Sequence, residues 1–163
     1  MKVAIIADTH DNLNAVSYLT GAFNAGGVEA VIHAGDFISP FVIPVLDRFN
    51  GEIHGVFGNN DGDRETLLKK SEGTTVSISE PPLQINLGGL NFVVAHTPGQ
   101  IAAADPGADF HVHGHTHEAV VTEEEDVLKI NPGEAGGWLS GTTHFALVNT
   151  ETKQVALRTV PAP

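Results

Sequence analysis

The stretch KVAIIAD at residues 2–8 is a run of apolar, often branched side chains that ends in a carboxylate. It is too short for a helix, and such a run is typical of a strand that is buried on both faces. Two later stretches repeat the pattern, AVIHAGD at residues 30–36 and EIHGVFGNND at residues 52–61. Each passes from apolar residues through small residues to a carboxylate or an amide. We therefore expect three buried strands that end in polar side chains.

The segments between these strands are compatible with helices. Asp11 or Asn12 is placed to cap a helix that runs towards Ala25, before a pair of glycines. Asp61 or Asp63 is placed to cap a second helix in the segment RETLLKKSE. Strands that alternate with helices predict a parallel sheet that is covered on both faces.

The second half of the sequence is richer in strand-like runs. These runs are separated by turn residues and lie at residues 75–80, 83–89, 90–96, 110–117, 119–126 and 127–133. Residues 143–160 predict a hairpin that turns around Asn149 to Thr152. The two halves together predict an α/β fold in which two β-sheets form a sandwich flanked by helices. Because no linker, repeat or low-complexity segment divides the chain, we expect a single domain over residues 1–163.

The composition excludes several classes of function. The 163 residues include 20 acidic and 8 basic side chains and no cysteine, so disulfides, thiolate metal ligands and a cysteine nucleophile are excluded. With a formal net charge of −12 and no basic cluster, binding to nucleic acid is disfavoured. No apolar run approaches the ~18 to 20 residues of a membrane span, and the first residues lack a signal-peptide cleavage pattern. We expect a cytoplasmic protein that binds neither nucleic acid nor membranes.

Potential metal ligands follow the predicted strands, and four of the nine histidines lie in HVHGHTH at residues 111–117. Because ligands of an open α/β sheet bind beyond the carboxyl ends of its strands, we expect these side chains to converge. Alone, each has another explanation, since Asp8 or Asp11 can cap a helix and Asp36 can close a turn. As a group they are harder to explain, because aligned imidazoles repel one another when protonated unless a cation or hydrogen bonds keep them neutral.

The types of ligand restrict the metal. Carboxylates, imidazoles and an amide without thiolates suit Mn²⁺, Ni²⁺, Fe²⁺, Co²⁺ or Zn²⁺ better than Ca²⁺ or a structural zinc. A pair of such ions needs a bridging carboxylate, for which Asp36 is the candidate. Two ions ~3.5 to 4 Å apart clamp a phosphoryl oxygen and generate hydroxide at neutral pH.

In the order D-x-H, GD, GNxD, a lone His and GHTH, these motifs resemble the calcineurin-like metallophosphoesterase superfamily, in particular its small single-domain phosphodiesterases. The likeness extends from Asp8 to about Gly133. It implies a four-layer αββα sandwich of two mixed β-sheets flanked by helices, with two divalent ions, Mn²⁺ being the first expectation. It also implies a phosphodiesterase in which a metal-bridging hydroxide attacks the phosphorus of a small phosphodiester. The implied metal ligands are Asp8, His10 and His117 for one ion, Asn59, His96 and His115 for the other, and Asp36 between both.

The sequence departs from the family pattern at Asn60, where many relatives carry a His that protonates the leaving group. An amide is no general acid near neutral pH, so we expect better activity on aryl phosphodiesters than on alkyl phosphomonoesters. Asp36, Asn60 and Asp61 are the candidate catalytic residues, Asp61 orienting a ligand or capping a helix. Glu134 follows "NPG" where many relatives have Ser.

Further roles follow from the same resemblance. Asn12 and Asn59 are the candidate substrate-binding residues, although Asn12 is nearly as well explained as a helix cap. His113 is expected beside the metal ligands, whereas His111 is expected to be structural. Exposed strand edges in the second half, and the assembly of the resembling enzymes, suggest a homodimer or homotetramer.

A function of another class competes with hydrolysis. A retromer subunit shares the implied fold, and relatives of that kind act as non-catalytic scaffolds that bind partner proteins. Such proteins tend to lose metal ligands, whereas all seven are present here. The sequence therefore favours the enzyme, and turnover of an aryl phosphodiester distinguishes the two.

Overall fold

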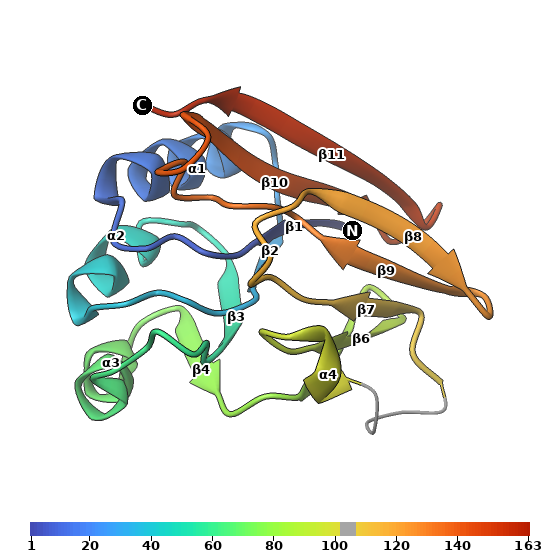
Figure 1. The fold of residues 1–163 in the computed structure, drawn as a ribbon, viewed down its shortest axis with the longest axis horizontal. Coiled ribbons are helices and arrows are strands. Elements are labelled where there is room, and N and C mark those ends of the chain that lie inside the picture. The colour runs from blue at the N-terminus through green and yellow to red at the C-terminus, as the bar shows by residue number, and fades with distance from the viewer. Residues whose placement is uncertain (102–106) are drawn as a thin grey trace.

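The computed structural model describes residues 1–101 and 107–163, which fold into two mixed β-sheets and four α-helices (Figure 1). The strands are β1 Lys2–Ile6, β2 Ala30–His33, β3 Glu52–Val56, β4 Val76–Ser79, β5 Leu83–Leu87, β6 Leu90–Val94, β7 Phe110–Val112, β8 Val120–Glu124, β9 Val127–Asn131, β10 Thr142–Asn149 and β11 Gln154–Pro161. The helices are α1 Leu13–Ala25, α2 Ile43–Leu46, α3 Arg64–Ser71 and α4 Pro98–Ile101, with a 3₁₀ turn η1 at Pro40–Val42.

The first sheet has the strand order β11-β10-β1-β2-β3-β4. Strands β1 to β4 run parallel to one another. Strand β10 pairs with the other edge of β1 in the antiparallel direction. Every residue of β2 is buried, as is β1 after Lys2, in agreement with the apolar runs of the sequence. The predicted C-terminal hairpin is confirmed, because β10 and β11 pair in the antiparallel direction from Thr142 to Asn149.

Helices α1 to α3 cover the outer face of the first sheet. Helix α1 begins after Asn12, whose side chain accepts a hydrogen bond from the backbone N–H of Ala15, and α3 begins after Asp63 in the same way. Val16, Leu19 and Phe23 form the buried stripe of α1 and belong to the core cluster against this face of the sheet. The sequence did not predict η1 and α2, which are short and have a proline in their first or second position.

The second sheet has the order β5-β6-β7-β9-β8 and packs its inner face against the first. Stacked rings of Phe92 and Phe110, with centroids 4.6 Å apart, belong to the shared core. On the outer face, Ile101 of α4 packs with Val93 and Ala95 in a separate small cluster. The four-layer sandwich is therefore confirmed, with a short helix in its fourth layer. Within the described ranges, no helix has the length and apolar character that crossing a membrane requires.

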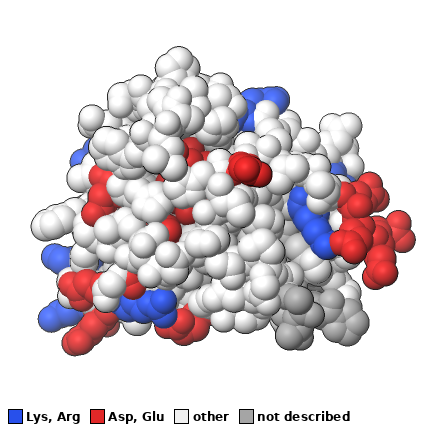
Figure 2. Space-filling view, in the orientation of Figure 1, with Lys and Arg blue, Asp and Glu red and all other residues white. Residues whose placement is uncertain are grey.

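Acidic side chains gather at the end of β8 and in the turn that follows it, where Glu123 and Glu124 belong to the strand and Glu125 and Asp126 to the turn. Figure 2 shows a red group at the right edge of the molecule, where Figure 1 places this turn, beside a blue patch. At this end of the sheet, Lys129 pairs with Glu124. Part of the acidic surplus of the sequence is thus exposed at one end of the second sheet.

Candidate metal centre

The loops that follow β1, β2, β6 and β7 meet at one edge of the sandwich. Backbone hydrogen bonds join the first two loops, from Asp8 N to the Gly35 carbonyl at 3.0 Å and from His10 N to the Asp36 carbonyl at 3.2 Å. The loop after β7 joins them, because His115 N donates to Oδ2 of Asp8 at 3.0 Å. Side chains more than a hundred positions apart in the sequence are thereby brought into contact, as the strand-end pattern predicted.

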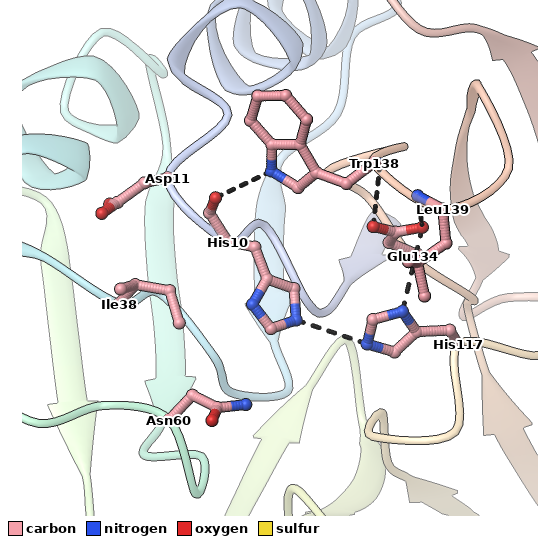
Figure 3. A pocket seen from close by; sticks show the side chains of 8 residues that line it. All are labelled: His10, Asp11, Ile38, Asn60, His117, Glu134, Trp138 and Leu139. Carbon is pink, nitrogen blue, oxygen red and sulfur yellow. Dashed lines mark hydrogen bonds and ion pairs between the residues drawn. The ribbon is translucent and has the colours of Figure 1, made fainter.

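A first group of potential metal ligands consists of Asp8, His10 and His117, whose ligand atoms all lie within 4.8 Å of one another. The two imidazole Nε2 atoms are 3.3 Å apart and face each other across the centre of Figure 3. Oδ1 of Asp8 lies 3.5 Å from Nε2 of His117 and 3.8 Å from Nε2 of His10. Three donor atoms therefore point at one small volume.

A second group consists of Asp8, Asp36 and His96, and all three side chains are buried. Nε2 of His96 lies 3.4 Å from Oδ2 of Asp36 and 2.9 Å from Oδ1 of Asn59. The same Oδ2 of Asp36 lies 3.6 Å from Nε2 of His10, a member of the first group. Asp8 thus belongs to both groups, and the Asp36 carboxylate lies close to an imidazole of each, so that it could act as a ligand to either ion.

His115 lies beside the second group and, like Asn59, is exposed. Its ring is edge-on to that of His96, with centroids 5.1 Å apart. The other five candidate ligands thus lie around Asp8 and Asp36, with His115 and Asn59 towards the surface.

The electrostatics of the two carboxylates differ. Burial raises the pKa of Asp8 to about 7. Burial acts in the same direction on Asp36, but hydrogen bonds from His96 and Asn60 outweigh it and hold the pKa of Asp36 below its usual range. Burial lowers the pKa of His117, so that its ring is neutral and able to donate an electron pair.

The group fits divalent cations. Oδ1 of Asp8 is buried and has no hydrogen-bond partner among the described residues, although the Nε2 atoms of His10 and His117 lie close to it. An orphaned buried carboxylate oxygen is unfavourable, and a cation shared with the two imidazoles satisfies it. Carboxylate, imidazole and amide donors without sulfur suit first-row divalent metals.

The backbone around these ligands adopts unusual conformations. Five of the seven candidates have a positive φ, with values from 42° to 71°, namely Asp8, His10, Asp36, His115 and His117. Such residues each cost of order 1 kcal/mol and persist where surrounding structure imposes them. Gly114 shows how closely the loops approach, because a Cβ there would lie 2.6 Å from Cβ of Ala7 and 2.8 Å from Oδ2 of Asp8.

Asn60 and Asp61 both support Asp36. The side chain and backbone N–H of Asn60 donate to the two carboxylate oxygens of Asp36, at 2.7 and 2.9 Å. The buried carboxylate of Asp61 accepts hydrogen bonds from the backbone of Asp36, Ile38 and Gly58. Of the two roles considered for Asp61, orienting a neighbouring ligand fits this geometry, since Asp63 caps α3.

Both polar atoms of the Asn12 side chain form hydrogen bonds within the protein. Its Oδ1 accepts from Ala15 N and its Nδ2 donates to the Gly136 carbonyl at 2.6 Å. The capping alternative therefore fits Asn12 better than a phosphate contact. His113 and His111 line a separate small cavity together with Lys129, and Nδ1 of His113 lies 3.2 Å from the carbonyl of Gly114 in the loop that carries His115.

A cavity of about 590 Å³ opens beside the first group of ligands. Figure 3 shows Asp11, Ile38 and Asn60 on one side of His10, and the segment from Glu134 to Leu139 on the other. The lining residues are His10, Asp11, Ile38, Asn60, His117, Glu134, Trp138 and Leu139. Sequence reasoning gave no role to Ile38, Trp138 or Leu139, although an isolated tryptophan in the glycine-rich stretch "GEAGGWLSG" was a usable signal.

Comparison with known proteins agrees with this geometry. Phosphodiesterase MJ0936 of Methanocaldococcus jannaschii is 37% identical over 159 residues, which cover 94% of this chain and 96% of that protein. The solved structure of a novel archaeal phosphodiesterase has a TM-score of 0.86 at 36% identity, over 98% of this chain and 100% of that one. Vps29 of Chaetomium thermophilum has a TM-score of 0.69 at 16% identity, over 100% and 98% of the two chains, which shows a shared fold alone.

The sequence profile of the calcineurin-like phosphoesterase superfamily domain matches residues 1–153, which is most of the chain. The matched residues contain both groups of potential metal ligands and the loops that carry them. The chain therefore belongs to the calcineurin-like phosphoesterase superfamily.

Proposed function

We propose that this protein is a metal-dependent phosphodiesterase that hydrolyses small phosphodiesters. The observation that carries the proposal is the meeting of two carboxylate–imidazole groups at Asp8 and Asp36, beside an open cavity. A phosphodiesterase that is 37% identical over nearly the whole of both chains supports the same reaction.

We assign Asp8, His10 and His117 to one divalent ion and Asn59, His96 and His115 to the other, with Asp36 as the bridging ligand. Mn²⁺ is the first candidate, and Ni²⁺, Fe²⁺, Co²⁺ and Zn²⁺ fit the same donors. When bound, such a pair acidifies water to give a nucleophile at neutral pH and offsets charge on the phosphoryl oxygens.

The protein's own residues position the bridging carboxylate and restrict the leaving group. Asn60 holds both oxygens of Asp36, and Asp61 holds the backbone that presents Asp36. Because the amide of Asn60 has no proton to give near neutral pH, a leaving oxygen beside it must depart without protonation from this side chain. Esters of acidic alcohols, such as aryl phosphodiesters, therefore react faster than alkyl phosphomonoesters.

We further propose a single cytoplasmic domain that self-associates as a homodimer or homotetramer. The core cluster shared by the two sheets supports one domain. The edge strands of the second sheet are β5 and β8. The backbone of an edge strand is a surface through which copies of a chain can pair. Sedimentation of the purified protein tests the assembly.

The test of the reaction is metal add-back. The protein is stripped of metal, and hydrolysis of bis-p-nitrophenyl phosphate and p-nitrophenyl phosphate is followed after addition of Mn²⁺, Ni²⁺ or Zn²⁺. We expect metal to restore turnover of the diester in the native chain and in Asp126→Asn, a control in the exposed β8–β9 turn. Asp36→Asn is expected to remain inactive.

Two outcomes contradict the proposal in different ways. Equal rates on bis-p-nitrophenyl phosphate and on a dialkyl phosphodiester would remove the argument from Asn60, because only the dialkyl ester has a leaving oxygen that needs a proton. Binding of metal without turnover of either p-nitrophenyl ester would favour the non-catalytic scaffold over the enzyme, and the search would then turn to protein partners.

A further inference from the structure

Two large apolar side chains lie exposed beside the first group of metal ligands. The accessible fraction is 62% for Trp138 and 80% for Leu139, and both line the cavity together with Ile38. The indole N–H of Trp138 donates to the backbone carbonyl of His10 at 2.9 Å, which fixes the ring next to a metal ligand (Figure 3). An exposed apolar surface in a cavity of this kind is typical of a binding site for an organic group.

A buried carboxylate holds this apolar wall in place. Glu134 is 2% exposed, and its two oxygens accept hydrogen bonds from the backbone N–H groups of Trp138 at 2.9 Å and Leu139 at 3.2 Å. Hydrogen bonds to an ionised acceptor are among the stronger ones in proteins. The wall is therefore preformed, so that a ligand does not have to order it on binding.

Apart from the metal ions that the proposed function requires, the charged side chains of the cavity are acidic. Its lining includes the carboxylates of Asp11 and Glu134, and within the described part of the chain it includes no lysine or arginine. A phosphodiester carries one negative charge, whereas a phosphomonoester carries close to two near neutral pH. The protein side chains thus add no attraction for a second negative charge beyond that of the metal ions, and the part of the cavity formed by Trp138, Leu139 and Ile38 suits an uncharged organic group of a diester.

We propose that this cavity binds a planar aromatic substituent of the phosphodiester, and that Trp138 is the residue that selects it. The inference rests on the proposed function, since the substituent is part of the substrate of that reaction. Stacking on the indole ring and contact with Leu139 and Ile38 favour an aromatic group over a methyl group. Glu134 acts indirectly, by holding the backbone of the wall.

The test compares two ligands that differ in one substituent. The monomethyl esters of phenylphosphonic and methylphosphonic acid each carry one negative charge, and calorimetry measures their dissociation constants for the Mn²⁺-loaded protein. We expect the phenyl compound to bind about tenfold more tightly. In native protein it should also change the fluorescence of Trp138, the chain's one tryptophan.

Variants assign the preference to the indole ring. Trp138→Ala and Trp138→Leu are expected to bring the two dissociation constants within about twofold of each other, whereas Trp138→Phe keeps most of the preference. Tyr18→Ala, which changes an exposed aromatic residue on α1 outside the cavity, should keep all of it. Thermal unfolding and bound-metal content identify any variant that fails to fold.

The outcomes separate this inference from the proposed function. A phenyl preference that survives in both Trp138→Ala and Trp138→Leu, or is absent from the native protein, overturns the inference. Loss of the preference in those variants supports it, even if bis-p-nitrophenyl phosphate is not hydrolysed and the proposed reaction fails.

Discussion

Oε2 of Glu134 lies 3.8 Å from Nδ1 of His117, on the opposite side of the ring from the Nε2 atom that faces Asp8 and His10. Nδ1 is buried and has no hydrogen-bond partner among the described residues. A carboxylate behind a metal-binding imidazole fixes the ring and increases its basicity. The same carboxylate holds the backbone of Trp138, so Glu134 connects the candidate metal ligand His117 to the apolar wall of the cavity.

We therefore expect Glu134→Gln to weaken metal binding by about 10- to 100-fold, the usual effect of losing such a carboxylate. Calorimetric titration of Mn²⁺ into metal-free protein measures it. Glu118→Gln, an exposed acidic residue next to His117 in the sequence, is the matched control and should bind like the native chain. Equal Mn²⁺ affinities in Glu134→Gln and Glu118→Gln would show that Glu134 only holds the backbone of Trp138 and Leu139 and does not support His117.

The raised pKa of Asp8 predicts a pH-dependent metal affinity. Because burial raises that pKa to about 7, the carboxyl of the metal-free protein holds a proton below pH 7 that a metal must displace. From this group alone, the apparent affinity should fall by up to about tenfold for each pH unit below 7 and change little above it. Calorimetric titrations with Mn²⁺ at pH 6 and pH 8 measure the affinity. Repeating each titration in two buffers of different ionisation enthalpy gives the number of protons released on binding.

Carboxyl-carbon NMR of metal-free protein separates Asp8 from the imidazoles that titrate nearby. A midpoint close to 4 for Asp8 would contradict the prediction.

The pH dependence that Asp8 gives to stability is opposite in sign to the one it gives to metal affinity. A carboxyl whose folded pKa is raised from 3.8 to about 7 binds more protons in the native state, so the metal-free fold loses stability as pH rises through this range.

His33 predicts a loss of stability at acidic pH. Its ring is fully buried and stacked on Phe37, with centroids 3.7 Å apart, and burial lowers its pKa from 6.5 to about 3. Between those two values the unfolded chain binds one proton more than the native state, so acidification from pH 6.5 to 5 should remove about 2 kcal/mol. Urea unfolding of metal-free protein measures the stability of the native chain and of His33→Gln at each pH. The stability of the native chain relative to the variant should fall by that amount between pH 6.5 and 5. Parallel pH profiles would refute it.

The close approach at Gly114 predicts a selective defect in metal binding. In Gly114→Ala the new methyl group would overlap Ala7 and Asp8, and one of the two loops must shift. We expect Mn²⁺ affinity to fall at least tenfold, with a loss of stability of about 1 to 3 kcal/mol. Gly21→Ala is the control, because nothing lies within 4 Å of a Cβ there and the site is inside α1. That variant should bind metal normally and unfold at a slightly higher temperature.

The sequence predicted the strands well because a strand buried on both faces leaves a local signal. The apolar run before Asp8 and the one before Asp36 are of this kind, and their polar ends converge as a parallel sheet requires. Asn12 could not be assigned from sequence, because its choice between cap and ligand depends on the Gly136 carbonyl, 124 positions away.

The wall of the cavity was out of reach of the sequence for a similar reason. The segment after β9 returns to the loop after β1, where Gly136 N donates to the Asp8 carbonyl at 2.9 Å. No periodicity links residues that meet in this way, so Glu134 was noticed only as a departure from relatives. The roles of Trp138 and Leu139 emerge from their position and exposure in the fold.

Asn60→His tests the absence of a general acid at this position. An imidazole there offers a proton to the leaving oxygen, which matters most for alcohols that leave poorly without one. For a series of phosphodiesters with leaving groups of increasing pKa, we expect the rate to fall less steeply in Asn60→His than in the native protein, with a gain of up to about 10²-fold for alkyl leaving groups. Asn60→Gln keeps an amide and should retain the native slope. Since Asn60 also holds Asp36, bound metal is measured in each variant, and a parallel slope at full metal occupancy would mean that protonation of the leaving group does not limit the reaction.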